Sequence, residues 1–249
     1  MSLSDAELER YARHIVLPRV GGAGQRALKA AKVAVVGAGG LGSPCLTYLA
    51  AAGVGTLTLI DDDVVGLSNL QRQTLFATAD CGRPKVEAAA ERLAALNPHV
   101  AFRPKHTRLT ADNAGALLSG HDVIADGSDL FATRAAVNRA AVRLGRPLVS
   151  AAIGPFEGQV ATFAGHLSDA PCWACFAGAA RDAPGESCAE AGVLGALAGM
   201  IGALQAAEVL RQLTGFEPLP PGTLFLFDAL QLRARTIRVR KDPHCPVCC

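Results

Sequence analysis

Apolar residues in this chain follow two patterns: short continuous runs, and longer segments in which they recur every three or four positions. Continuous runs bounded by glycine or polar residues indicate buried strands, and the helical spacing indicates helices. The predicted strands are Lys32–Val36, Thr56–Ile60 and His121–Asp126. The predicted helices are Asp5–Ile15, Ser43–Ala52 and a segment from Arg83-Pro84-Lys85 to Leu96. Because strands alternate with helices, the pattern favours an α/β fold with a mostly parallel sheet.

Local residues set the expected ends of these helices. Ser4 and Glu7 have the spacing of a capping box, so the first helix is expected to begin at Asp5 and to end before Pro18. Gly53 is expected to end the helix that follows the first strand. Pro84 is expected at the first helical position of its segment, where proline is favourable.

A glycine-rich turn joins the first predicted strand to the following helix. Gly37, Gly39, Gly40 and Gly42 let the backbone turn tightly and approach a phosphate or ribose, while the helix start offers unpaired amides. Asp61 lies about 20 residues beyond the turn, where a carboxylate accepts hydrogen bonds from a ribose. The unit predicts a nucleotide site on a Rossmann-like sheet and leaves NAD, FAD and ATP open. Close packing is the alternative role of the glycines.

The polar stretch after the second strand separates these nucleotides. Ser68, Asn69, Arg72 and Gln73 lie in a predicted loop at the carboxyl edge of the sheet, where open α/β sheets bind ligands. A cation in the first turn of a helix costs roughly 0.3–1 kcal/mol, and an anionic ligand offsets that cost. Lys85 in such a turn, with Arg72, is therefore predicted to hold a triphosphate. An exposed surface lysine is the alternative.

Asp129 follows the third predicted strand, at the same edge of the sheet as the glycine turn. A carboxylate in that place is suited to hold a magnesium ion that bridges phosphate oxygens. Asp129 is also a candidate N-cap of the next helix, and the two roles are compatible. A dinucleotide-dependent dehydrogenase has little use for this set of cations and acid, so ATP and Mg²⁺ are the predicted ligands.

Two Cys-x-x-Cys pairs lie in the second half of the chain, Cys172 with Cys175 and Cys245 with Cys248. Two such pairs far apart in sequence can close one tetrahedral thiolate site, the donor set that structural Zn²⁺ prefers. The first residues do not form a secretory leader, so we expect a cytoplasmic protein whose thiols stay reduced. A redox-active dithiol is the alternative to zinc, and Cys249 is an alternative ligand to Cys248.

The composition bounds the size of the fold and its partners. The chain has 249 residues, 50% of them apolar, and a formal net charge of +2, so neither nucleic acid nor a membrane is an expected partner. The longest apolar run, Ala191–Leu204, is too short to cross a bilayer, and its Gly195 and Gly199 are expected to permit close helix packing. We expect one domain over residues 1–249. Its nucleotide-binding half is 1–150, and a zinc-bearing half of mixed or antiparallel sheet is 151–249.

These motifs, in this order, resemble the ubiquitin-activating-enzyme-like adenylyltransferases. The matching parts are Gly-x-Gly-Gly-Leu-Gly, Asp61, Ser-Asn-Leu-Gln-Arg-Gln, Arg83-Pro84-Lys85, the string from Cys188 to Val193 and the terminal Cys-x-x-Cys. The resemblance extends from Arg10 to Cys248, and within the family it is greatest to the molybdopterin-synthase and thiamine sulfur-carrier adenylyltransferases. The polar string combined with the paired cysteines is specific, whereas the glycine turn alone is not.

The resemblance implies an activity and a set of partners. A small ubiquitin-like sulfur-carrier protein presents its C-terminal Gly-Gly carboxylate, which attacks the α-phosphate of ATP to give an acyl adenylate and pyrophosphate. The implied roles are ribose binding by Asp61, phosphate binding by Asn69, Arg72 and Lys85, and magnesium binding by Asp129. Arg13 would enter the site from the neighbouring subunit of a homodimer. A separate sulfur donor is expected, because no sulfurtransferase domain follows the second cysteine pair.

The resemblance also leaves alternatives open. Leu130 stands where the family commonly has asparagine, so a contact of that asparagine is missing. Cys188 matches a cysteine that related enzymes use for a thioester or acyl persulfide, but an inert loop thiol is the favoured interpretation. The rival functions are an NAD-dependent oxidoreductase and a non-catalytic, zinc-bearing binder of ubiquitin-like tails. The pathway, whether molybdopterin, thiamine, thiolated tRNA or cysteine synthesis, is not specified by these motifs.

Overall fold

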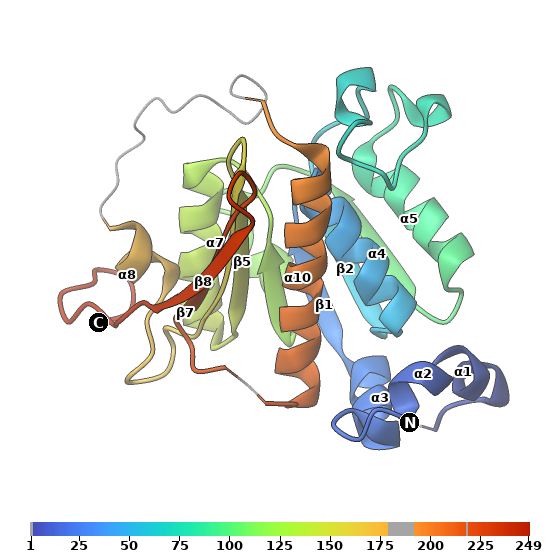
Figure 1. Ribbon diagram of the computed structural model, residues 1–249, viewed down its shortest axis with the longest axis horizontal. Coiled ribbons are helices and arrows are strands. Elements are labelled where there is room, and N and C mark those ends of the chain that lie inside the picture. Colours follow the sequence, from blue (N-terminus) through green and yellow to red (C-terminus); the bar gives the residue numbers. More distant parts are fainter. Residues whose placement is uncertain (1, 179–191, 218) are drawn as a thin grey trace.

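A computed structural model describes residues 2–178, 192–217 and 219–249. In these ranges eight strands form one sheet in the order β3-β2-β1-β4-β5-β6-β7-β8 (Figure 1). The strands are β1 Lys32–Val36, β2 Thr56–Asp61, β3 Ala101–His106, β4 Val123–Asp126, β5 Leu148–Ile153, β6 Glu157–Phe163, β7 Thr223–Asp228 and β8 Arg233–Arg238. Strands β1 to β5 are parallel, and β6 to β8 are antiparallel to their neighbours. The predicted fold class is confirmed.

Helices cover both faces of the sheet. They are α1 Asp5–Arg10, α2 Ala12–Ile15, α3 Gly21–Ala30, α4 Gly42–Ala52, α5 Lys85–Leu96, α6 Ala114–Leu118, α7 Phe131–Leu144, α8 Trp173–Ala177 and α10 Gly195–Thr214. Helices α4, α5 and α10 lie on one face, and α6 and α7 lie on the other (Figure 1). Val33 and Val35 of β1 belong to the first apolar core, and Ala34 and Val36 belong to the second. Burial on both faces explains why the parallel strands read as continuous apolar runs.

Helix α10 packs closely against both the parallel and the antiparallel strands. A Cβ atom on Gly202 would come within 2.4 Å of the Leu41 carbonyl oxygen, and one on Gly158 within 2.3 Å of Ile201 Cγ1. Of the two glycines predicted to permit close packing, Gly195 is packed against Gln71, whereas a Cβ atom on Gly199 would meet no described atom within 4 Å. None of the described helices combines the length and apolar character that a membrane span requires.

The first predicted helix is broken into two. The capping box is present, because Ser4 Oγ accepts from Glu7 N at 3.3 Å and Ser4 N donates to Glu7 Oε2 at 2.8 Å. The prediction of one helix to Ile15 was wrong, because the chain turns at Tyr11. The ring of Tyr11 packs under Gly53, and its hydroxyl accepts from Asn97 Nδ2 at 2.9 Å, so tertiary packing overrides the local helical pattern.

Of three other predicted helix ends, one is confirmed and two differ by one residue. Gly53 ends α4 with φ 82°, as predicted. Pro84 is the N-cap of α5 with φ −54° and ψ 129°, so the helix begins at Lys85 and the predicted position of the proline was wrong. The N-cap of α7 is Leu130 rather than Asp129, which leaves the carboxylate of Asp129 without a capping role.

Candidate functional site

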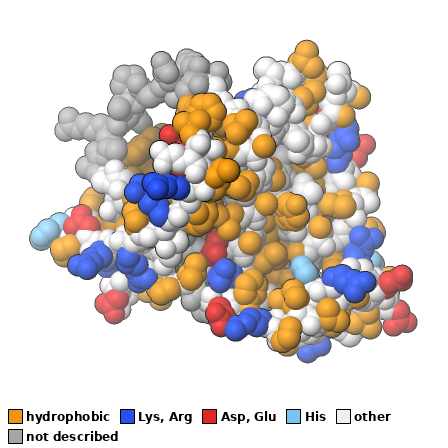
Figure 2. Space-filling model, in the orientation of Figure 1, with side chains coloured by type: hydrophobic (Ala, Val, Ile, Leu, Met, Phe, Trp, Pro, Cys, Tyr) orange, Lys and Arg blue, Asp and Glu red, His pale blue; other side chains and the backbone are white. Residues whose placement is uncertain are grey.

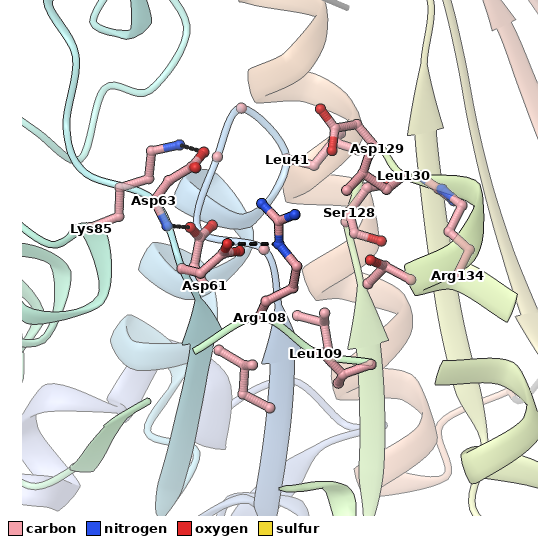
Figure 3. A pocket seen from close by; sticks show the side chains of 18 of the residues that line it. Leu41, Asp61, Asp63, Lys85, Arg108, Leu109, Ser128, Asp129, Leu130 and Arg134 are labelled. Atoms are coloured by element: carbon pink, nitrogen blue, oxygen red, sulfur yellow. Dashed lines mark hydrogen bonds and ion pairs between the residues drawn. The ribbon is translucent and has the colours of Figure 1, made fainter. Parts of the chain in front are cut away.

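A cavity of about 400 Å³ opens at the carboxyl ends of the central strands. It lies between the turns that follow β1 and β4, where the strand order reverses and open α/β sheets bind their ligands. Its volume is within the range of small-molecule sites. The charged residues that line it are Asp61, Asp62, Asp63, Arg72, Lys85, Arg108, Asp129 and Arg134 (Figure 3).

The glycine turn forms one wall of this cavity. Gly37 has φ 88°, and a Cβ atom there would lie 3.2 Å from the Gly127 carbonyl oxygen in the turn after β4. A Cβ atom on Gly42 would lie 1.8 Å from the Gly37 oxygen, so the turn closes on the start of α4 with no room for a side chain. Gly39 and Gly40 face the cavity directly. The sequence therefore needs glycine here for geometric reasons that agree with close approach of a ligand.

Asp61, at the end of β2, is hydrogen-bonded to the glycine turn. Its Oδ2 atom accepts from Ala38 N at 2.7 Å, and its Oδ1 atom accepts from Asp63 N at 2.8 Å. Burial raises the pKa of this carboxyl group, although the charge of Lys85 and the two backbone hydrogen bonds act in the opposite direction. Each carboxylate oxygen can accept a further hydrogen bond. The side chain can thus accept hydrogen bonds from the hydroxyl groups of a ligand that lies against the turn.

Lys85 and Arg72 approach the cavity from the connection between β2 and α5. Lys85 Nζ lies 2.8 Å from Asp63 Oδ2; the lysine side chain is only 6% exposed, and that of Asp63 is 64% exposed. Lys85 is therefore not the exposed surface lysine of the alternative interpretation. Arg72 Nη1 donates to the Ser68 carbonyl oxygen at 3.1 Å. Two cations, one of them buried, thus face the same cavity as the glycine turn.

The other residues of the polar loop are placed differently. Asn69 and Gln73 line the cavity, and Asn69 Oδ1 accepts from Gly66 N at 3.2 Å. Gln73 is buried, and its Oε1 atom has no hydrogen-bond partner among the described residues. A buried orphan acceptor of this kind calls for a partner such as water or a ligand. Ser68 does not line the cavity and contributes through its carbonyl oxygen.

Two predicted site residues, Asp129 and Arg13, are exposed, and only Asp129 lines the cavity. Asp129 is exposed at the rim. Arg13 is exposed on α2, which packs against α3 beyond the amino ends of the strands, far from the carboxyl ends where the cavity opens (Figure 1). Cys188 lies outside the described residues. Within one chain, Asp129 is therefore close to the turn that it was predicted to serve, and Arg13 is not.

Sequence reasoning missed two arginines of the cavity. Arg108, which follows β3, donates from Nε to Asp62 Oδ2 at 2.8 Å. Arg134 lies at the fourth position of α7 and is 9% exposed. Arg108 belongs to no motif, but the cost of a cation near a helix start, which singled out Lys85, applies equally to Arg134.

A second cavity adjoins the first over the antiparallel strands. Its volume is about 790 Å³, and it shares Ala152 and Ile153 with the first cavity. Charged and polar residues of β6, β7 and β8 line it, among them Glu157, Gln159, Asp228, Arg233 and Arg235. Figure 2 shows hydrophobic side chains at the tips of the neighbouring hairpins, where Phe156, Leu230 and Leu232 are exposed. The two cavities are therefore neighbours that meet at Ala152 and Ile153.

The four paired cysteines meet at one place. Their Sγ atoms all lie within 4.8 Å of one another, with 3.6 Å between Cys172 and Cys245, 3.5 Å between Cys175 and Cys248 and 3.9 Å between Cys172 and Cys175. A tetrahedral site with Zn–S bonds of about 2.3 Å places its sulfur atoms about 3.8 Å apart. The donor set and the spacing therefore fit zinc. Cys249 lies outside the cluster, and its Sγ donates to the Asp242 carbonyl oxygen at 3.1 Å.

A buried amide supports this cluster from α7. Asn138 Nδ2 donates to Cys172 Sγ at 3.5 Å, and Asn138 Oδ1 accepts from Trp173 N at 2.9 Å. Hydrogen bonds behind the metal ligands orient them and are typical of zinc sites. The cluster joins α8 to the segment after β8, so a metal there would fasten the C-terminal segment to the body of the fold.

Comparison with known proteins identifies the family of the chain. A model of the ThiF family matches residues 11–247. A sulfur carrier protein adenylyltransferase of Thermus thermophilus is 48% identical over 252 residues, which cover 100% of this chain and 93% of that protein. A molybdopterin-synthase adenylyltransferase of Escherichia coli is 41% identical over 246 residues, which cover 99% of this chain and 98% of that protein.

A solved structure shows the same fold. The crystal structure of E. coli MccB with MccA-N7isoASN superposes with a TM-score of 0.84 and covers 96% of this chain and 75% of that one. Its sequence identity is 23%, so the likeness concerns the arrangement of strands and helices alone.

Proposed function

The chain belongs to the ThiF family, and from this premise we infer that it is an adenylyltransferase that acts on a ubiquitin-like sulfur-carrier protein. An oxygen of the carrier's C-terminal carboxylate attacks the α-phosphorus of ATP. The bond from that phosphorus to the outer two phosphates breaks, and the products are an acyl adenylate and pyrophosphate. The single observation that carries the proposal is the cavity in which the glycine turn, Asp61, Arg72 and Lys85 converge.

The proposed roles of the side chains follow from their positions. Asp61 accepts hydrogen bonds from the ribose, and the amides of the glycine turn face the phosphates. Arg72, Lys85 and Asn69 hold the phosphates and reduce the repulsion between the attacking carboxylate and the nucleotide. No nucleophilic side chain is required, so catalysis consists of orientation and of charge stabilisation.

Asp129 is the proposed ligand of a magnesium ion. Its exposed carboxylate lies at the rim of the cavity and carries no capping hydrogen bond, so it is free to bind a cation on the phosphates. A divalent ion at that point neutralises charge on the phosphate oxygens.

The second cavity is the proposed path of the carrier's tail. It joins the first cavity at Ala152 and Ile153, so an extended peptide lying over β6 reaches the α-phosphate with its terminal carboxylate. The exposed apolar residues Phe156, Leu230 and Leu232 stand beside this path. The acyl adenylate then becomes the substrate of a separate sulfur donor.

The cysteine cluster is the proposed zinc site, with a structural role. Four thiolates complete the coordination of zinc and leave no open position for a substrate. Such a site persists where thiols stay reduced, which supports a cytoplasmic location.

Carrier-dependent exchange of radioactive pyrophosphate into ATP tests the proposed function. Arg72→Ala and Lys85→Ala should abolish exchange and leave the zinc content unchanged, because the two sites are separate. Arg139→Ala, which removes an exposed arginine from α7 outside the cavity, is the matched control and should keep full exchange. Full activity of the Arg72 and Lys85 variants would contradict the assigned site.

The same assay separates the rival functions and the candidate carriers. A dehydrogenase transfers a hydride between NAD and a substrate, and a non-catalytic binder retains its carrier. Neither exchanges pyrophosphate. Incubation with ATP and each purified carrier of the molybdopterin, thiamine, thiolated-tRNA and cysteine pathways, followed by mass spectrometry, identifies the carrier that gains the mass of AMP. A protein that adenylates none of them contradicts the proposal.

A homodimer with shared sites is part of the proposal. Arg13 is exposed near the amino ends of the strands, whereas the cavity opens at their carboxyl ends, so Arg13 can contribute only to the site of a second copy. Arg13→Ala and Lys85→Ala should each be inactive alone. Their mixture should recover about a quarter of the sites, because each mixed dimer pairs one intact Lys85 with one intact Arg13. A mixture without activity contradicts shared sites and leaves the adenylation proposal standing.

A further inference from the structure

A buried guanidinium connects the loop that carries Asp129 to the sheet. Arg134 Nη2 donates to the carbonyl oxygens of Ser128 and Ala151, the latter at 2.7 Å, and Nη1 donates to Ser150 Oγ at 3.3 Å. All three acceptors are neutral. No carboxylate of the described residues forms an ion pair with Arg134. Burying a cation among neutral groups costs free energy that no ion pair offsets.

The loop has few other anchors. Ser128 donates from its backbone N and its Oγ to Asp126 Oδ1, at 3.0 and 2.7 Å. Leu130 has no polar side-chain atom, is 49% exposed and caps α7 without a side-chain hydrogen bond. The position of Asp129 is therefore set by the bonds of its two neighbours: the Leu130 carbonyl oxygen accepts from Arg134 N at 3.1 Å, and the Ser128 carbonyl oxygen accepts from the Arg134 guanidinium.

We propose that Arg134 is a positioning residue that fixes Asp129 at the rim of the cavity, where its carboxylate holds a divalent cation on the nucleotide phosphates. The inference rests on the proposed function, because it places ATP in this cavity. Arg134 also donates to the carbonyl oxygen of Ala151, which precedes the two residues shared by both cavities, Ala152 and Ile153. One side chain therefore fixes the loop that carries Asp129 relative to the place where ATP and the carrier's tail are proposed to meet.

Binding of ATP without the carrier, measured by calorimetry in Mg²⁺ and in EDTA, tests this role. Asp129→Asn measures how much of the gain in ATP affinity on adding Mg²⁺ depends on the Asp129 carboxylate. In Arg134→Gln the gain in ATP affinity on adding Mg²⁺ should be at least about tenfold smaller than in wild type, because loss of a partner behind a metal ligand weakens metal binding. Its ATP affinity in EDTA should stay within about twofold of wild type. Arg139→Gln, on the exposed side of the same helix, should change neither value.

The double variant Asp129→Asn with Arg134→Gln decides whether the two residues act together. It should bind ATP in Mg²⁺ no more weakly than Asp129→Asn alone, because Arg134 acts through Asp129. Additive losses, or an undiminished gain from Mg²⁺ in Arg134→Gln, would overturn the inference.

Two milder variants cover the case in which Arg134→Gln does not fold. Arg134→Lys keeps the charge without the planar fork, and Ser150→Ala removes one acceptor and leaves the guanidinium in place. Both should lower the gain from Mg²⁺ by a few-fold with unchanged zinc content, and an unchanged gain in both refutes the role of Arg134. A wild-type protein that neither binds ATP nor exchanges pyrophosphate contradicts the proposed function itself, which is a different result.

Discussion

Replacing Gly42 with alanine perturbs the glycine turn by a known distance. The added Cβ atom would lie 1.8 Å from the Gly37 carbonyl oxygen, and real Cβ atoms essentially never come closer than 3.0 Å. The turn or the start of α4 must therefore move by about 1.2 Å. A misplacement of about 1 Å can cost about 100-fold in catalysis, so we expect kcat/KM for carrier adenylation to fall by about two orders of magnitude, equivalent to about 2.7 kcal/mol.

The assay is steady-state pyrophosphate release with saturating carrier, accompanied by thermal unfolding. Gly199→Ala is the matched control, because that helical glycine has no described atom within 4 Å of an added Cβ. The control should keep full activity and gain about 0.5–1 kcal/mol of stability from the lower entropy of the unfolded chain. Wild-type kcat/KM in Gly42→Ala would refute the reasoning that close contact in this turn sets the geometry of the nucleotide site.

The other predictions concern the cysteine cluster and a buried carboxylate. Cys245→Ser should lose its zinc, measured by atomic absorption, and melt at a lower temperature, whereas Cys249→Ser, outside the cluster, should keep both; equal zinc in the two variants contradicts the ligand set. Glu7 is buried, which opposes its ionisation, but Lys29 and Ser4 outweigh this effect and lower its pKa from 4.5 to about 2. The ionised Glu7 thus contributes roughly 3 kcal/mol to the free energy of unfolding above pH 4.5, and this contribution is lost as the pH falls toward 2. Glu7→Gln should therefore be less stable than wild type in denaturant titrations at pH 7 and should lose less stability on acidification. Parallel curves of stability against pH for the two proteins contradict this.

The core of the proposed nucleotide site could be predicted because its residues follow one another in sequence. A strand, a glycine turn, a helix and an acid at the next strand end form one βαβ unit, and the physical requirements of each part are local. The two cysteine pairs could be predicted to meet because thiolates at that spacing prefer a common metal. In each case the chemistry of the residue type restricts what it can do.

The remainder depends on contacts between distant segments. The helix break at Tyr11 is set by packing against Gly53 and Asn97, which local propensity does not contain. Arg108 reaches the cavity from the segment after β3, and its role follows from its place in the sheet order rather than from any neighbouring residue. Arg134 lies on a helix whose apolar spacing gives no sign of the carbonyl groups that its guanidinium will meet.

The continuity of the sheet through β5 has a consequence for dissection of the protein. Residue 150 lies inside Leu148–Ile153, a strand that pairs with β4 along one side and with β6 along the other. Separate expression of residues 1–150 and 151–249 would divide this strand and leave each fragment with a long, unprotected apolar edge. Such edges aggregate, so the two fragments should be recovered as a stable pair only when they are synthesised together in the same cell.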